Sequence, residues 1–331
     1  MKKIKVVFLL VFISIMLSAC GQVKNYDARV EYEEKVNNYL NEQQYSGVVL
    51  IATKDGIIYE DRIGYCDEEE QEKIGLTTVF EAGSLTKQMT AAAILKMDEE
   101  KLLSMDDDLS KYFPECKWAA EETIRDLLNM NSHIPDYMNS EQITELSSQE
   151  EIKQEILSME PVADVTGYSN SNYYLLGLII EQVSGQSYAD YMEENFFEEI
   201  GMRHTQMGCT DEEKFPAIKA KESYPYYVTY SAGSLCTDMY DLYQWEKAYF
   251  GGKVLPEQYF LEVLQANNTY LYGLECADGA YFHQGETLNF SSYMGYDTKS
   301  GIQIILLSNK EDIETSKICE DVLKLTMGYV D

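Results

Sequence analysis

The sequence predicts an α+β fold in which one antiparallel sheet is built from both ends of the chain and a large helical lobe is inserted between them. Strand patterns lie near the two ends of the 331-residue chain, and helix patterns fill its middle. Because a sheet must bury one face against other elements, this order implies a single sheet, closed by both chain ends and flanked by helices.

The first predicted elements are a helix and a hairpin. Apolar residues recur with helical spacing over residues 30–43, which predicts an amphipathic helix. The apolar run over residues 47–52 predicts a buried strand. A turn at residues 54–56 then leads into a returning strand over 57–60.

Helices dominate the middle of the chain. A long helix is predicted to begin at Ser84, because residues 89–97 are mostly strong helix formers with apolar faces. Gly185 is a suitable C-terminal stop for a later helix. The further predicted helices span residues 124–130, 150–158, 172–183 and 188–200.

Strand patterns return near the C-terminus. The predicted strands span residues 281–283, 290–294 and 302–307, with a turn at 297–301, and a final helix spans 313–327. We therefore expect one domain over residues 30–331. Its α/β lobe would comprise about 30–84 and 225–331, and its helical lobe about 85–224.

The N-terminus has the pattern of an export signal. Three lysines within the first five residues precede an apolar run over residues 6–13, which is too short for a transmembrane helix. The segment ends in Leu17-Ser18-Ala19-Cys20, which resembles the lipobox of bacterial lipoproteins. That resemblance implies a signal peptide over 1–19, a lipid on Cys20, a tether over 20–29 and a place on the outer face of the cell membrane. A plain secretory signal with an incidental Cys20 is the alternative.

The composition excludes some partners. The formal net charge is -31, and so acidic a surface repels phosphate backbones, which argues against nucleic acid as a partner. The same charge favours solubility, and we expect a monomer. The six cysteines after Cys20 form no CxxC pair, which argues against a zinc ribbon or a thioredoxin motif. We expect buried free thiols, although an exported protein could pair some of them.

The first motif with chemical potential is Ser84-Leu85-Thr86-Lys87. A strand-like segment precedes it and a buried helix follows, so Ser84 and Lys87 share one helix face at the positive end of the helix dipole. A desolvated lysine at this place can be neutral and can accept the serine proton. The alternative is a serine that caps the helix, with a solvated lysine.

The second motif is Tyr168-Ser169-Asn170, in a loop just before an apolar helix. A tyrosine there can transfer a proton, and the asparagine can hold Lys87 or a substrate amide. Tyr137, in Tyr137-Met138-Asn139, is the rival tyrosine.

The third motif is His283-Gln284-Gly285 on a predicted strand. Gly285 would let a substrate approach the strand backbone closely. A half-buried strand histidine without a catalytic role is the alternative. Similar patterns at Lys54 and Lys299 fall in hairpin turns, where the glycine has a structural reason.

Together and in this order, the three motifs resemble those of the serine β-lactamase, DD-peptidase and esterase family, in its class C-like branch. The family set is Ser-x-x-Lys, Tyr-x-Asn, and Lys or His followed by x-Gly. Further segments resemble the family in the same order. They span residues 77–115, 123–137, 167–185, 196–207, 231–248 and 282–310.

The resemblance implies a penicillin-recognising serine hydrolase acting on a peptide, amide or ester. Ser84 would attack a carbonyl and form an acyl-enzyme, while Lys87 and Tyr168 move the proton. The resemblance also implies supporting roles. Asn170 would position Lys87 and substrate, and His283 would supply polarity near the tyrosine. The backbone N–H groups of Ser84 and Glu286 would form the oxyanion hole.

Two departures from the family bear on the substrate. His133 stands where relatives often have glycine near the cleft, and Glu286 follows the third motif, where its carboxylate would repel an anionic substrate. His283 in place of lysine is also a weaker cation at neutral pH. These changes predict poor activity on substrates with a carboxylate. They also motivate the alternative of a catalytically weakened penicillin-binding or ligand-sensing protein.

Other chemistries have little support in the sequence. It contains no Gly-x-Ser-x-Gly nucleophile elbow, no P-loop and no dinucleotide fingerprint. Its three histidines lack metal-ligand spacing. We therefore expect no cofactor and no metal.

Overall fold

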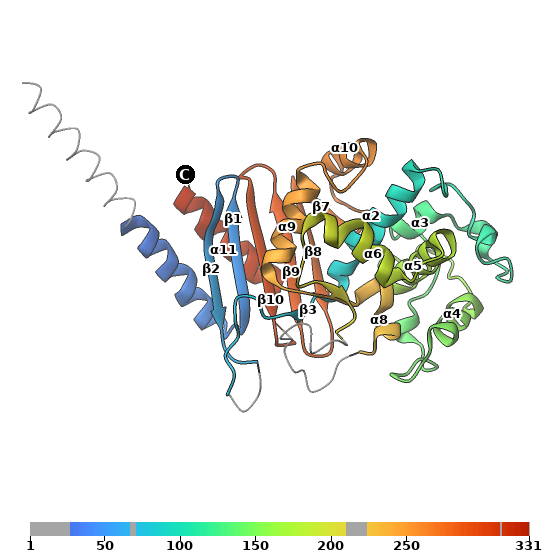
Figure 1. Cartoon of the computed structure of the whole chain (residues 1–331), viewed down its shortest axis with the longest axis horizontal. Coiled ribbons are helices and arrows are strands. Elements are labelled where there is room, and N and C mark those ends of the chain that lie inside the picture. Colours follow the sequence, from blue (N-terminus) through green and yellow to red (C-terminus); the bar gives the residue numbers. More distant parts are fainter. Residues whose placement is uncertain (1–26, 67–70, 210–223, 312, 331) are drawn as a thin grey trace, which may run out of the picture. The chain divides into compact units, whose positions relative to one another are not determined.

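The computed structural model describes residues 27–66, 71–209, 224–311 and 313–330 (Figure 1). These residues fall into two units: residues up to Tyr45 together with those from Lys317 onward, and Ser46–Ser316. The predicted signal peptide and Cys20 lie outside the described residues, and residues 27–29 of the predicted tether are already helical. Among the described helices, none has the length and apolar character required to cross a bilayer.

The smaller unit consists of two helices, one over residues 27–42 and most of α11 (Thr315–Val330). The Tyr32 hydroxyl lies 2.8 Å from Thr326 Oγ1, and the Tyr32 ring stacks on Tyr329 with ring centroids 4.4 Å apart. The Tyr39 hydroxyl donates to Asp321 Oδ2 over 2.9 Å. These contacts join the two ends of the chain, and both helices were predicted to within three residues at either end.

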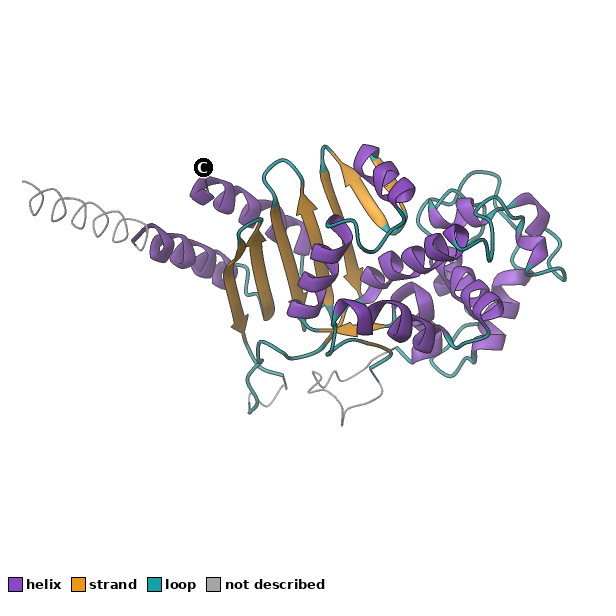
Figure 2. Ribbon diagram, turned by 45° about the horizontal axis from the view of Figure 1, so that its top comes forward, coloured by secondary structure: helices purple, strands orange, loops and turns teal. Residues whose placement is uncertain are grey.

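The larger unit contains a seven-stranded antiparallel sheet with the strand order β2-β1-β10-β9-β8-β7-β6 (Figures 1 and 2). Its first strand pairs directly with its last strand in the chain, with Val49 opposite Leu306. This confirms the predicted sheet built from both ends. The strands are β1 (Gly47–Thr53), β2 (Gly56–Ile63), β6 (Thr269–Leu271), β7 (Leu274–Ala277), β8 (Ala280–Glu286), β9 (Ser291–Asp297) and β10 (Ile302–Ser308).

The central strands are apolar on both faces. All of β10 is buried, and so is β1 from Gly47 to Ala52, which explains why both sequences read as continuous apolar runs rather than alternating ones. The strands β6 and β7 were not predicted, because at three and four residues they are too short for a period to be recognised in the sequence.

The helices of the larger unit lie beyond one end of its sheet and against the sheet (Figure 2). Those in the predicted helical region match the sequence pattern closely, although residues 188–200 form α6, one π-helical turn and α7 instead of one regular helix. The helices of this unit include α2 (Thr86–Glu99), α3 (Ile124–Leu128), α4 (Gln149–Ser158), α5 (Asn170–Ser184), α6 (Tyr188–Met192), α7 (Glu198–Ile200), α8 (Tyr226–Gly233), α9 (Met239–Phe250) and α10 (Glu257–Gln265).

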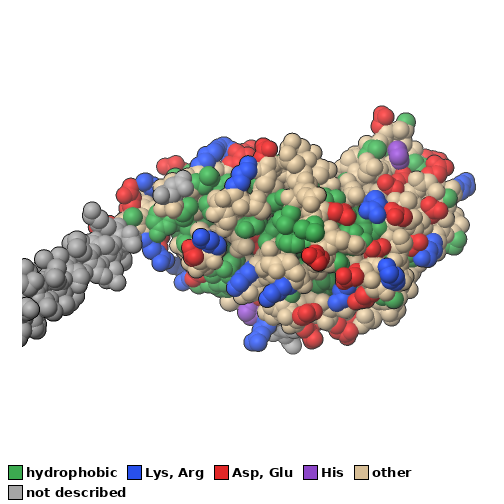
Figure 3. All heavy atoms as spheres, turned by 90° about the horizontal axis from the view of Figure 1, so that it is seen from above, with side chains coloured by type: hydrophobic (Ala, Val, Ile, Leu, Met, Phe, Trp, Pro, Cys, Tyr) green, Lys and Arg blue, Asp and Glu red, His purple; other side chains and the backbone are tan. Residues whose placement is uncertain are grey.

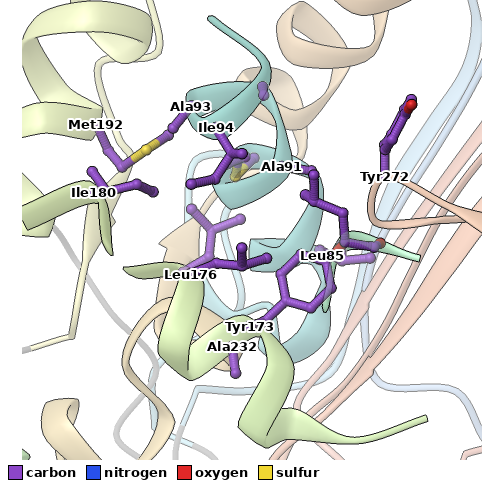
Figure 4. Close-up of a cluster of buried hydrophobic side chains, with 14 of the residues drawn as sticks. Leu85, Ala91, Ala93, Ile94, Tyr173, Leu176, Ile180, Met192, Ala232 and Tyr272 are labelled. Carbon is purple, nitrogen blue, oxygen red and sulfur yellow. The ribbon is translucent and has the colours of Figure 1, made fainter. Parts of the chain in front are cut away.

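Helix α2 runs through the core. Every residue from Thr86 to Leu95 is buried, and Ala91 and Ala93 are small enough to let neighbouring helices approach closely. Figure 4 shows Ile94 and Ala93 packed towards Ile180 of α5 and Met192 of α6. Because a close-packed interior resists displacement, the start of α2 is held in a fixed position.

A second, small sheet has the strand order β3 (Phe80–Glu81), β5 (Leu235–Thr237) and β4 (Gln206–Met207), and its strand β3 leads towards α2. A disulfide joins Cys209, which follows β4, to Cys236 on β5, with Cα atoms 5.6 Å apart. The expectation of free thiols was therefore wrong for these two residues, because strand pairing brings together cysteines that are distant in sequence. Cys116 and Cys276 are buried free thiols, as expected.

Surface charge is spread over the molecule on the face shown in Figure 3. Acidic side chains lie among basic ones there and do not gather into one continuous patch. Acidic side chains that are spread over the surface agree with the interpretation that the net charge of -31 favours solubility.

Candidate active site

Ser84 lies in a 3-10 turn, Gly83–Leu85, that leads directly into α2. No side-chain cap is present at the start of either helix, and the Lys87 side chain is fully buried. The alternative of a capping serine with a solvated lysine is therefore wrong. Ser84 Oγ lies 2.9 Å from Lys87 Nζ, because residues three apart on a helix share one face.

The Lys87 amine is surrounded by acceptors. It donates to Asn170 Oδ1 over 2.8 Å and to the Ala232 carbonyl over 2.8 Å. Burial lowers the pKa of Lys87 to about 7, although the charge of Asp136 opposes the shift. In the neutral amine, two N–H bonds serve these two acceptors and the lone pair faces Ser84, so the amine can accept the serine proton.

A break in α8 supplies one of those acceptors. Tyr230 has φ 38° and ψ -134°, outside helical values, in the middle of this short helix. The carbonyls that follow face α2, where Ser231 O accepts from Thr90 Oγ1 over 2.7 Å and Ala232 O accepts from Lys87. Backbone strain of this kind is typical of functional sites.

Asp136 is a site residue that the sequence analysis did not single out. Its carboxylate accepts hydrogen bonds from Asn170 Nδ2 over 2.8 Å and from the Asn170 backbone N–H over 3.1 Å. These bonds turn Asn170 Oδ1 towards Lys87. The available signal was the position of Asp136 beside Tyr137, within a segment already assigned to the family pattern.

Tyr168 lies against the amine, with Lys87 Nζ 4.8 Å from its ring centroid. Burial raises the pKa of Tyr168 well above its ordinary value, and a hydrogen bond with Ser84 partly opposes the shift. The phenol is therefore protonated at neutral pH. The rival Tyr137 is buried elsewhere, and its hydroxyl donates to Val228 O, so the structure brings Tyr168 and not Tyr137 to the serine.

His283 faces the same site from β8 and is 2% exposed. Its Nδ1 bonds to the Gln284 carbonyl, so Nδ1 carries the proton and Nε2 accepts from the Tyr270 hydroxyl over 3.2 Å. Burial and the Lys87 charge lower the pKa of His283 to about 3. The imidazole is therefore neutral. Tyr270, on the unpredicted β6, is a second residue that sequence reasoning missed.

Gly285 has a different purpose from the one predicted. A Cβ at Gly285 would lie 2.1 Å from the Ala82 carbonyl oxygen, so the missing side chain admits the backbone that leads to the serine rather than a substrate. A Cβ on Gly83 would likewise lie 2.8 Å from the Glu286 nitrogen. The backbone N–H of Glu286 is thus beside the turn that carries Ser84, while its carboxylate is exposed.

His133 does not contribute to this site. Its Nδ1 lies 2.8 Å from Glu122 Oε1, and it lines a separate cavity of about 840 Å³ that shares no residue with the cluster around Ser84. The sequence analysis placed His133 near the cleft, but its ring faces Glu122 and this separate cavity.

One group of side chains, His204, Asp238 and Asp241, has the composition of a metal site. Hydrogen bonds within the group and to its neighbours already occupy these side chains. His204 Nδ1 lies 2.7 Å from Asp238 Oδ2, and Asp241 Oδ2 accepts from the His204 backbone N–H and from the Thr205 hydroxyl. These bonds connect β4 to the start of α9, which is a sufficient structural reason for the cluster.

Comparisons with known proteins agree with this geometry. A family model described as "Beta-lactamase" matches residues 32–324. PbpX of Bacillus subtilis (strain 168), whose name classes it with penicillin-binding proteins, is 28% identical over 293 residues, covering 85% of this chain and 74% of PbpX. The chain spans between 38% and 66% of the length of further curated relatives that it matches.

Two solved structures show the same fold. FmtA from Staphylococcus aureus has a TM-score of 0.79 at 20% identity, with 89% of each chain covered. The D-amino acid amidase of Ochrobactrum anthropi SV3, complexed with L-phenylalanine, has a TM-score of 0.77 at 21% identity, with 93% of this chain and 100% of that chain covered.

The first prediction concerns pH. Because the neutral Lys87 amine is the form that accepts the serine proton, labelling of Ser84 by a fluorophosphonate should rise about tenfold per pH unit below about 7 and level off above it. Lys87→Arg cannot become neutral and should lose about a hundredfold or more in rate. A flat wild-type profile between pH 5 and 8, or an arginine variant at wild-type rates, would contradict this role.

The second prediction concerns Asp136. Its charge raises the pKa of Lys87, so Asp136→Asn should move the rising limb of the labelling profile to lower pH. The plateau should also fall about tenfold, because Asn170 loses its anionic acceptor. The exposed Asp164→Asn removes the same charge from a loop and serves as control. A lower plateau without a shifted limb would indicate a structural role alone.

Proposed function

The chain belongs to the beta-lactamase family, and on that premise we propose that it is a serine hydrolase that forms an acyl-enzyme through Ser84. The observation that carries the proposal is the fully buried Lys87 amine, 2.9 Å from the Ser84 hydroxyl and bonded to two acceptors. Nucleophile and base within hydrogen-bonding distance, with the base oriented by a third group, is the arrangement that activates a serine.

In the proposed reaction, neutral Lys87 takes the proton of Ser84 as Oγ attacks the substrate carbonyl carbon. The backbone N–H groups of Ser84 and Glu286 stabilise the negative oxygen of the tetrahedral intermediate. The intermediate collapses by breaking the bond to the leaving group, which takes its proton from the Tyr168 phenol, and Lys87 returns a proton to Tyr168. Water then hydrolyses the ester on Ser84 by the reverse proton movements.

The proposed substrates are peptides, amides or esters that lack a carboxylate beside the scissile bond. Neutral His283 offers no cation to such a group, and the exposed Glu286 carboxylate adds negative charge at the same strand end. Activity like that of an amidase or an esterase fits these constraints, whereas a D-alanine peptidase must accept a carboxylate beside the scissile bond. The similarity of fold to a D-amino acid amidase is compatible with an amide substrate.

A ligand-sensing protein that acylates slowly or not at all is the second candidate. Glu286 still favours it, because a negative carboxylate beside the oxyanion site would hinder many substrates of this family. His133 no longer does, since it faces another cavity.

The labelling experiment for this proposal uses a fluorophosphonate and a fluorescent penicillin with the wild type and Ser84→Ala, followed by a panel of esters and amides. We expect the fluorophosphonate to label the wild type only and penicillin, which carries a carboxylate, to label it weakly. Labelling without product release would favour the sensor. The proposal fails if neither probe reacts and Ser84→Ala retains hydrolysis equal to the wild type.

We also propose that the protein is held at the outer face of the cell membrane by lipid on Cys20, which the sequence pattern of residues 1–20 supports. Cys20→Ala should shift the protein from the membrane fraction to the medium when cells are fractionated. The anchor is excluded if the alanine variant stays with the membrane as the wild type does.

A further inference from the structure

A cavity of about 560 Å³ lies beside Tyr168 and has no part in the mechanism above. The loops around residues 129–130, 167–168 and 268–269 border it, together with strands β6, β7 and β8. The cavity shares Tyr168 and Tyr270 with the cluster around Ser84, since the Tyr168 ring lies 4.8 Å from Lys87 Nζ and the Tyr270 hydroxyl bonds to His283. The cavity therefore adjoins the site of the proposed reaction.

The walls of the cavity are aromatic. Tyr168 and Tyr270 meet edge to face, with ring centroids 6.0 Å apart, and Phe282 adds a third ring. Met130 contributes a buried apolar side chain. Faces of aromatic rings attract cations, also at partly exposed positions such as that of Tyr168, which is 46% exposed.

One carboxylate faces these rings. Glu275 on β7 stands opposite Tyr270 of β6 and opposite Phe282 of β8, and residues directly opposite one another in an antiparallel sheet share one face. Among the described residues that line the cavity, Glu275 is the only acidic one, and none is basic. Burial is the main cause of the raised pKa of both Tyr168 and Tyr270, and the negative charge of Glu275 adds to it.

The Glu275 carboxylate has no partner within the chain. In the described part of the structure it makes no hydrogen bond and no ion pair, whereas the Glu262 carboxylate of α10 accepts a hydrogen bond from the Tyr272 hydroxyl. Glu275 is exposed to solvent on one side, and its partial desolvation still raises the pKa of the carboxyl. A cationic ligand would relieve that cost, because an ion pair stabilises the charged carboxylate.

From this arrangement we infer that the cavity is a subsite for the protonated amine of the substrate, with Glu275 as the anionic partner and Tyr168, Tyr270 and Phe282 as the aromatic walls. This inference rests on the proposed function and narrows its substrate class. The preferred substrates are amides or esters of amino acids, or peptides, with a free ammonium group close to the scissile carbonyl. The absence of a cation at His283 fits the same class, because such substrates need no anion-binding group.

The test measures binding without turnover, so that it is independent of the proposed reaction. Alaninamide and N-acetylalaninamide differ in the charge of the amine and are titrated, in both enantiomers, into Ser84→Ala by ligand-observed NMR. We expect Ser84→Ala to bind alaninamide about tenfold more tightly than the double variant Ser84→Ala/Glu275→Gln, the size of one charge-assisted hydrogen bond. Binding of N-acetylalaninamide should change less than about twofold, because a neutral amide gains little from Glu275.

Asp278→Asn in the same background is the matched control. Asp278 lies in the turn between β7 and β8, does not line the cavity, and has a φ of 52°, which asparagine tolerates. It should leave both affinities unchanged. Equal binding of alaninamide with and without Glu275, or equal binding of the two ligands to Ser84→Ala, would overturn the subsite. Failure of the wild type to hydrolyse either ligand would count only against the proposed reaction.

Discussion

The structure depends on one desolvated amine. Burial moves the pKa of Lys87 from 10.5 to about 7, which corresponds to about 5 kcal/mol between the charged and neutral forms. Since the folded-state pKa lies below the ordinary value, this cost to stability is complete below about pH 7 and disappears as the pH rises through 10.5. The surrounding core must supply that energy, and α2, which is buried from Thr86 to Leu95, is part of that core.

Around this amine, the charges are arranged in a consistent way. His283 is neutral because it is buried and adjoins Lys87, so the site keeps the lysine as its one titrating base near neutral pH. Glu286 and Glu275 lie at exposed positions along β8 and β7. A site that is neutral inside and negative at its border disfavours carboxylates, because the border repels an approaching anion and the interior offers it no cation.

The sequence predicted the elements whose pattern is local. The apolar runs of β1 and β10, the helix after Ser84 and the pairing of Ser84 with Lys87 depend on spacing within one element. The family pattern added Tyr168 and His283. Asp136, Tyr270 and the disulfide were missed because each acts across a distance in sequence, through the turn of a loop or the register of a short strand. The purpose of Gly285 was misassigned for the same reason, since the backbone of Ala82 that fills its place is distant in the chain.

The site features that the sequence analysis missed have a common physical cause, which also explains how the Lys87 amine is kept in place. The first acceptor of the Lys87 amine, Asn170, is oriented by Asp136 from another loop, and the second, the Ala232 carbonyl, is exposed by a break in α8. Helix α2, which carries Lys87, supplies neither of these two acceptors. A helix alone would therefore leave the amine buried without partners, at a cost of several kcal/mol. The neutral Lys87 amine beside Ser84 thus depends on contacts from several distant parts of the chain. A substitution that removes one of its two acceptors should change the pKa of Lys87 even where the fold is kept.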